Sequence, residues 1–319
     1  MFFASQIKSL NESDIKVFMI GGNHDVPRIP NQPVLAIDLL GTTGLAKVFS
    51  KSHVLQHITI EINGKPVSVY GKSYYQQFDP KNPLNDINKL NTDHYNIVMI
   101  HGSLLGLGIS PPSPEMAAYN PFYADDISGD INYLALGHFH NHFEVDKNHT
   151  KICNPGSIEK LTWGEMNDKK GFIWAETSGS ETTTEFVDLP CRPMQKEQII
   201  LSREDNEPDT KISDSISRVS DHEKIFKASI RGSISIEQYN RLRVEELCNI
   251  FRESFFDLVI DREDLEVIEY GKVFLGKVES PTAAFSKRID KIKSKTDNQQ
   301  QATFFEDVKS KVRIPGTGL

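Results

Sequence analysis

The sequence predicts an α/β (α+β) protein: a layered β-sandwich flanked by helices, followed by a small α+β unit and a helical tail. Short apolar runs that end close to a glycine carry this prediction, because such runs are typical of central buried strands. They lie at residues 16–20, 96–100 and 132–136. The 319 residues allow one large core and a second, smaller one.

Each of these runs leads directly into side chains that bind metal ions. Asn23 and His24 follow the first run, His101 follows the second, and His138 and His140 follow the third. Ligands at the ends of neighbouring strands converge on one edge of a sheet. Histidine together with asparagine suits manganese, iron or zinc better than magnesium or calcium, which prefer oxygen ligands. The pattern therefore predicts a metal-dependent hydrolase.

The remaining elements of the first domain follow in order. Asn63-Gly64, between two alternating runs, predicts a hairpin of strands 54–62 and 67–70. Residues 106–121, rich in proline, serine and glycine, predict a long loop beside the histidines. The polar, acidic residues 202–214 predict a linker.

Beyond the linker, a strand at 225–231, a helix at about 235–256 and strands near 258–260 and 265–270 are predicted. Capping patterns at Ser280-Pro281 and Thr303–Glu306 predict short helices in the tail. The predicted organisation is a first domain at 1–195, a linker at 196–222, a small α+β domain at 223–274 and a helical tail at 280–314.

Composition narrows the classes of function. A net charge of −8 argues against a protein that coats nucleic acid unspecifically, although bound metal ions would still let a nuclease hold phosphate. Residues 275–315 are the basic exception, with nine Lys and Arg against five Asp and Glu. The three cysteines form no CxxC pair, so neither a disulfide framework nor a structural zinc site is expected. No apolar run is long enough for a membrane span and the start does not resemble a signal peptide, so we expect a cytoplasmic protein with no membrane partner.

A lone histidine is usually structural, but three motifs in one order are a stronger signal. GNHD at 22–25, a strand-borne histidine at 101 and GHxH at 137–140 resemble the calcineurin-like metallophosphoesterases. That family has the pattern DxH, GDxxD, GNH(D/E), His and GHxH on a four-layer sandwich. The resemblance implies that Asn23, His101 and His138 hold one divalent ion and that His140 holds its neighbour. It also implies that His24 faces the scissile phosphate as transition-state stabiliser or acid.

This assignment agrees with what phosphodiester hydrolysis requires. Two metal ions about 3.5–4 Å apart stabilise charge on the phosphoryl oxygens and activate a water, while a histidine protonates the leaving oxygen. Asp25 is expected to orient the loop or His24, as carboxylates near metal sites commonly do. His142 and the remaining histidines are interpreted as structural or solvated.

A narrower resemblance covers more of the chain. Residues 154–160, 163–165 and 170–172 are similar to the "PGS-x-E…GE…KGF" stretch of SbcD-type DNA repair nucleases, and 189–194 to their "LP-x-RP". This implies a manganese-dependent exo/endonuclease acting on double-stranded DNA ends, with iron or zinc as alternative metals, and with Gly156 and Ser157 near the ligands or the substrate. It also implies a DNA-capping role for the small domain and an SbcC-type coiled-coil ATPase partner docked on the tail. A homodimer stays open.

The chain departs from the family at its start. DxH and GDxxD are absent, and before GNHD the only aspartate is Asp14, with Lys16 two places on. We therefore expect an N-terminally truncated chain that binds metal weakly and has little or no nuclease activity alone. Two alternatives remain: a metallophosphoesterase of small phosphodiesters, nucleotides or phosphoproteins, and a non-catalytic scaffold of the repair complex.

Overall fold

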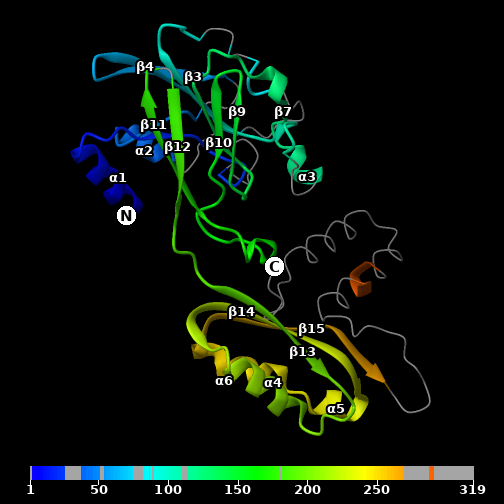
Figure 1. Ribbon diagram of the computed structural model, residues 1–319. Coiled ribbons are helices and arrows are strands. Elements are labelled where there is room, and N and C mark those ends of the chain that lie inside the picture. The colour runs from blue at the N-terminus through cyan, green and yellow to red at the C-terminus, as the bar shows by residue number, and fades with distance from the viewer. Residues whose placement is uncertain are drawn as a thin grey trace, which may run out of the picture. The chain divides into compact units, whose positions relative to one another are not determined.

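The structure is a computed structural model that describes residues 2–25, 37–50, 54–74, 82–85, 87, 90–109, 114–179, 181–268 and 287–290. The chain divides into two compact units, Met1–Cys191 and Arg192–Leu319 (Figure 1). Of the predicted tail helices at 280–314, only a helical turn at 287–290 falls within the described residues.

A six-stranded mixed sheet forms the centre of the first unit. Its strand order is β3-β4-β5-β8-β10-β9, with four parallel strands in the middle and an antiparallel strand at each edge. The bounds are β3 (Gln56–Ile62), β4 (Lys65–Lys72), β5 (Tyr95–His101), β8 (Tyr133–Gly137), β9 (Phe143–Lys147) and β10 (Thr150–Asn154). The predicted hairpin and the strands near 96–100 and 132–136 are confirmed. Asn63 and Gly64 both have positive φ angles, as the two-residue hairpin turn requires.

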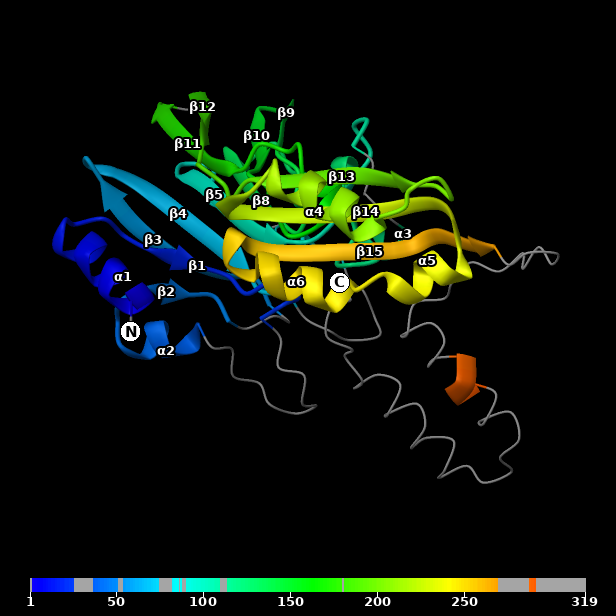
Figure 2. The ribbon, with the colours of Figure 1, turned by 90° about the horizontal axis from the view of Figure 1, so that it is seen from below.

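A small parallel pair of strands covers one face of this sheet. It consists of β1 (Phe18–Met19) and β2 (Lys47–Val48). Phe49 is fully buried with Val67 and Val69 of β4 in the core between the two sheets. On its other face the pair is packed by α1 (Phe2–Glu12) and α2 (Asp38–Thr42), as Figure 2 shows.

The opposite face of the central sheet has its own core. Buried side chains of β5, β8 and β10 pack there against residues from the loops that follow them. These loops contain β6 (Leu104–Leu105), α3 (Pro114–Ala117), β7 (Phe122–Tyr123) and η1 (Ala124–Asp126), so the predicted loop at 106–121 includes a short helix. The unit ends with η2 (Trp163–Glu165) and a hairpin of β11 (Gly171–Ser178) and β12 (Glu181–Asp188). A central mixed sheet with flanking helices and strands confirms the α/β class.

The second unit is a three-stranded parallel sheet with helices on one face (Figure 1). Its strands are β13 (Met194–Leu201), β14 (Asp221–Ser235) and β15 (Phe255–Ile268). The first crossover contains α4 (Pro208–Ser217), and the second contains α5 (Ile236–Arg241), α6 (Val244–Phe251) and η3 (Arg252–Ser254). Crossovers between parallel strands are almost always right-handed, and two such steps in one direction place their helices on the same face. The core of this unit is built from its own residues.

Three sequence predictions for this region are wrong. The expected linker at 196–222 instead holds most of β13 and all of α4. The sequence did not predict these two elements because each buries only a few apolar side chains and is otherwise polar in composition. The expected single helix at 235–256 is broken at Leu242, whose extended backbone ends α5 while its side chain is buried in the core. The two strands near 258–260 and 265–270 are one strand, since β15 continues to pair with β14 through the polar residues between them, across a register shift between Ser229 and Arg231.

Candidate metal centre

The predicted histidine ligands follow parallel strands that end at one edge of the central sheet, where sites in such sheets usually lie. β5 ends at His101, and β8 ends at Gly137 directly before His138. The loop after β1 is tied to the same edge, because the backbone N–H of Gly21 donates to Ser73 Oγ over 2.8 Å. The backbone N–H of Tyr74 donates to the carbonyl of Gly21 over 2.8 Å.

Asn23 and His101 are in direct contact although 78 residues separate them: Asn23 Oδ1 and His101 Nε2 are 2.7 Å apart. Two donor atoms that bind one ion at right angles, each at about 2.1 Å, would lie about 3 Å apart. The two atoms are therefore close to the spacing of two ligands on one ion. The contact depends on Gly22, where a Cβ would lie 2.6 Å from Cε1 of the His101 ring.

His138 joins this pair. Its ring centroid is 5.2 Å from that of His101 and 5.1 Å from that of Tyr119. The ring of Tyr74 contacts two of these rings: its centroid is 6.2 Å from that of His101 and 5.7 Å from that of Tyr119. The backbone of His138 has a φ of 112°, a conformation that residues other than glycine rarely adopt. Strain of this kind is often found at functional sites.

Electrostatics keep His101 neutral. The pKa of His101 is lowered to about 3, first because burial disfavours the charged ring, and then because His138, His24 and His140 repel a further positive charge. Neutral imidazole is the form that binds a metal ion, so His101 is ready to coordinate at physiological pH. The three neighbours also show that His24 and His140 lie within electrostatic reach of His101, and the side chain of His24 is exposed.

His140 is held by a carboxylate. Its Nδ1 is 3.0 Å from Oε1 of Glu165, which is buried in η2. Burial alone would raise the pKa of Glu165, but hydrogen bonds from Lys170, His140 and Thr162 lower it to about 2. Glu165 is therefore ionised at any ordinary pH.

The other predicted site residues support the loops that carry the ligands. Asp25 Oδ2 accepts a hydrogen bond from the backbone N–H of Gly22 over 2.7 Å, so Asp25 orders the turn around Asn23. Gly156 has a φ of 81°, and a Cβ there would lie 2.6 Å from the carbonyl oxygen of His140. The backbone N–H of Ser157 donates to that same oxygen over 3.2 Å.

Comparison with known proteins adds an independent observation. No family model matches the chain. It is 26% identical over 217 residues to the DNA double-strand break repair protein Mre11 of Methanocaldococcus jannaschii, which covers 64% of this chain and 54% of the relative. It is 27% identical over 198 residues to Mre11 of Methanococcus maripaludis, covering 57% and 49%. It is 25% identical over 187 residues to the uncharacterized metallophosphoesterase YhaO of Bacillus subtilis, covering 58% and 43%.

The chain is thus similar in sequence to Mre11-type repair proteins and to a metallophosphoesterase. This confirms the resemblance found in its motifs and the expectation of a metal-dependent phosphodiesterase or nuclease family, at low identity. The chain spans about half the length of the curated relatives it matches.

The donor set of the chain is incomplete for two ions. Among the described residues no group of three or more His, Cys, Asp or Glu side chains is arranged to hold a metal ion. An amide oxygen and imidazole nitrogens fit one borderline divalent ion at Asn23, His101 and His138, and His140 is the one predicted ligand for a second. The aspartates of DxH and GDxxD, which the family pattern would add, do not occur in this sequence.

Sequence reasoning assigned no role to four residues around the ligands. Glu165 and Lys170 belong to the GE and KGF motifs. These motifs indicated the family resemblance, but they did not indicate that the two residues lie beside His140. Tyr74 and Tyr119 come from loops with no recognisable pattern. His142 has structural contacts, as expected: its Nε2 is 3.0 Å from Glu144 Oε1, and its ring stacks on that of Phe186 with the centroids 4.1 Å apart.

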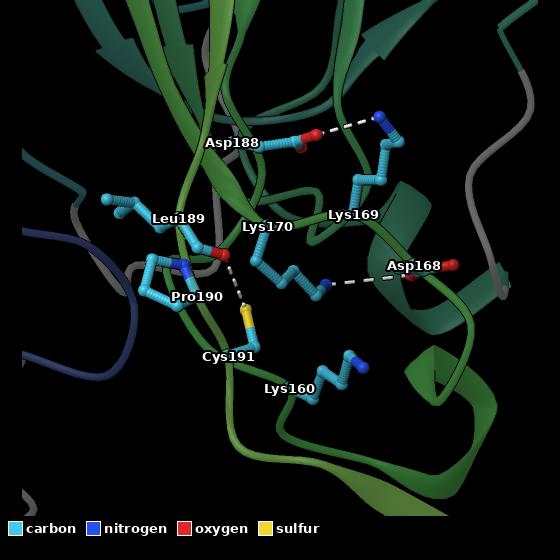
Figure 3. A pocket seen from close by; sticks show the side chains of 8 residues that line it. All are labelled: Lys160, Asp168, Lys169, Lys170, Asp188, Leu189, Pro190 and Cys191. Carbon is cyan, nitrogen blue, oxygen red and sulfur yellow. Dashed lines mark hydrogen bonds and ion pairs between the residues drawn. The ribbon is translucent and has the colours of Figure 1, made fainter.

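Lys170 also lines a pocket of about 350 Å³ (Figure 3). Most of its charged side chains are paired: Lys169 with Asp188 at 2.7 Å, and Lys170 with Asp168 at 3.6 Å. Its lining is Lys160, Asp168, Lys169, Lys170, Asp188, Leu189, Pro190 and Cys191.

Within the described part of the chain, no helix combines the length and apolar character needed to cross a bilayer. The cytoplasmic location remains a prediction.

Proposed function

We propose that the chain is part of an SbcD-like DNA repair nuclease that hydrolyses phosphodiester bonds at double-stranded DNA ends with two divalent metal ions, manganese being the expected metal. The contact of Asn23 with His101 at the ends of two strands, in a relative of Mre11, carries this proposal. Asn23, His101 and His138 would hold one ion and His140 the other. Bound there, the ions would neutralise phosphoryl charge and activate a water.

The chain's own residues supply the remaining chemistry. His24 is exposed directly beyond Asn23 and can donate a proton to the leaving oxygen. Asp25 stabilises the turn that carries Asn23 and His24. Glu165 orients His140. In this proposal the second unit caps the DNA, and the tail at 280–314 docks an SbcC-type coiled-coil ATPase. A homodimer is compatible with the proposal but not required by it.

A specific observation favours a second candidate. Because DxH and GDxxD are absent and the described carboxylates do not complete a metal cluster, the chain as given should bind metal weakly and cleave little DNA alone. A non-catalytic scaffold that binds DNA or the ATPase is the alternative, and a phosphoesterase of small phosphodiesters is a third.

One experiment separates these candidates. Hydrolysis of linear double-stranded DNA and of bis(p-nitrophenyl) phosphate is measured with Mn²⁺, for this chain and for a version to which a segment carrying DxH and GDxxD is added. DNA-end cleavage by the extended protein, abolished by His24→Ala, supports the nuclease. Cleavage of the small ester alone supports the third candidate, and tight DNA binding with no cleavage supports the scaffold.

A further inference from the structure

The segment 154–170 surrounds His140 with hydrogen bonds. Asn154 Nδ2 donates to the carbonyls of Phe139 and Asn141, both over 2.8 Å, and so fixes the backbone on either side of His140. Lys170 Nζ donates to the carbonyl of His140 itself over 2.9 Å. The main chain of His140 is thus held independently of its ring.

The ring of His140 is held by Glu165, and the surroundings of Glu165 determine which ring nitrogen carries the proton. One oxygen of the carboxylate, Oε2, accepts hydrogen bonds from Lys170 Nζ over 2.8 Å and from the backbone N–H of Leu161 over 3.3 Å. Both of these groups can only donate. An ionised carboxylate only accepts hydrogen bonds. The Nδ1 of His140 must therefore be the donor to Glu165 Oε1, which leaves the lone pair on Nε2.

His142, two residues away, has the opposite arrangement. Its Nε2 faces Glu144 Oε1 at 3.0 Å and its ring stacks on Phe186. By the same reasoning that ring carries its proton on Nε2, which donates to Glu144. Two adjacent His–Glu pairs thus select opposite tautomers, and only that of His140 leaves Nε2 open.

We propose that the segment 154–170 is a positioning device for His140, in which Glu165 selects the Nδ1–H tautomer and Lys170 fixes both Glu165 and the His140 backbone. This inference rests on the proposed function, which makes His140 a metal ligand. It assigns a physical role to the PGS-x-E, GE and KGF motifs. Glu165 and Lys170 are positioning residues, since both act through their contacts with His140.

The variant Glu165→Gln gives a directional test. Lys170 Nζ and the backbone N–H of Leu161 must face the amide oxygen, because neither can accept a hydrogen bond. The amide NH₂ then faces Nδ1 of His140 and drives the proton to Nε2. The matched control is Glu144→Gln, which alters the neighbouring pair and should leave His140 unchanged.

The measurement is ¹⁵N NMR of histidine-labelled, metal-free full chain, with the His140 signal assigned from a His140→Gln sample. We expect Nδ1–H at His140 in the wild type, Nε2–H in Glu165→Gln, and Nδ1–H in Glu144→Gln. Titration with Mn²⁺ should broaden the His140 signal at about 10–100-fold higher concentration in Glu165→Gln, the usual loss when such a partner is removed.

The proposal is overturned if the wild type shows Nε2–H at His140, or if a folded Glu165→Gln keeps Nδ1–H. Should Glu165→Gln fail to fold, the wild-type tautomer alone decides. These readouts need no DNA cleavage. A chain that has the expected tautomers but belongs to an inactive complex would therefore contradict the proposed nuclease and leave the positioning role intact.

Discussion

Single glycines in this chain are required for two different reasons, and the reasons can be separated. Gly156 combines a left-handed φ of 81° with a Cβ position 2.6 Å from the carbonyl of His140. Gly44 has a similar φ of 71°, but nothing lies within 4 Å of its Cβ position. Backbone strain is therefore common to both, whereas close approach to a candidate ligand is particular to Gly156.

Gly156→Ala should destabilise the chain more than Gly44→Ala. Gly44→Ala, the control, should lower the free energy of unfolding by about 1–2 kcal/mol through left-handed strain alone. Gly156→Ala should lower it further, because the loop that carries His140 must shift. Chemical denaturation measures both, and His140 NMR shifts report the movement. Equal costs with an unmoved His140 would contradict this account.

Adjacent lysines provide a second contrast. Lys170 is fully buried and pairs with buried Glu165 at 2.8 Å, while Lys169 pairs with Asp188 at 2.7 Å in solvent. Removing one partner of a buried pair leaves an uncompensated charge and typically costs about 3–5 kcal/mol, whereas exposed pairs are worth about 0–1 kcal/mol.

Lys170→Met is therefore expected to lower the free energy of unfolding by about 3–5 kcal/mol, and Lys169→Met by at most about 1 kcal/mol. Adding Glu165→Gln to Lys170→Met should recover part of the loss, because no buried charge then remains. A urea-denaturation double-mutant cycle measures the coupling. Strict additivity would show that the two residues do not act as a pair.

Among the elements, the long strands of the second unit show how a polar stretch can remain a strand. Lys227 of β14 and Asp261 of β15 form an ion pair of 2.8 Å across the parallel ladder. Burial alone would raise the pKa of Asp261, but the hydrogen bonds from Lys227 and from the backbone N–H of Glu263 lower it below its usual value of 3.8. The pair therefore contributes stability mainly when Asp261 is ionised.

This stability has a defined pH dependence. Because the pKa of Asp261 is lower in the folded state, its contribution is present above about pH 3.8 and is lost as the pH falls through the folded pKa. Asp261→Asn should destabilise the unit by up to about 1 kcal/mol at neutral pH, with a smaller difference from wild type in acid. Asp257→Asn, on the exposed side of β15, is the control. A difference that grows on acidification would contradict the assignment.

The elements also show where sequence patterns succeed. β4, β5 and β8 are apolar on both faces or nearly so, and the Asn63-Gly64 turn has one preferred geometry, so these strands were predictable. α4 was not, because only Ile212 and Ile216 among its apolar residues enter the core. A helix that packs by so narrow a stripe has the composition of a linker.

For the whole molecule, the two units have separate cores. All buried residues of the second core lie between Ile199 and Leu265, and Phe226 stacks on Phe255 at a centroid distance of 5.2 Å within it. A unit with its own core should unfold as its own cooperative block.

A fragment of residues 192–268 is therefore expected to fold alone, with a single unfolding transition and dispersed NMR signals. Phe226→Ala should destabilise the fragment by about 3–5 kcal/mol. In the full chain it should shift one calorimetric transition and leave that of the first unit in place. A fragment without cooperative unfolding, or a mutation that shifts both transitions equally, would show that the units depend on each other.

The types and order of the candidate ligands follow from the sequence by itself, because each ligand comes after an apolar strand in a recognisable motif. Which of them meet is decided only by the tertiary structure. Asn23 and His101 are 78 residues apart, and His140 and Glu165 are 25 apart. Local sequence determines where a strand ends and which side chains follow it, since backbone propensity and alternation act over a few residues. How the two sheets and the connecting loops pack depends on the whole core, and that packing brings these pairs within hydrogen-bond distance.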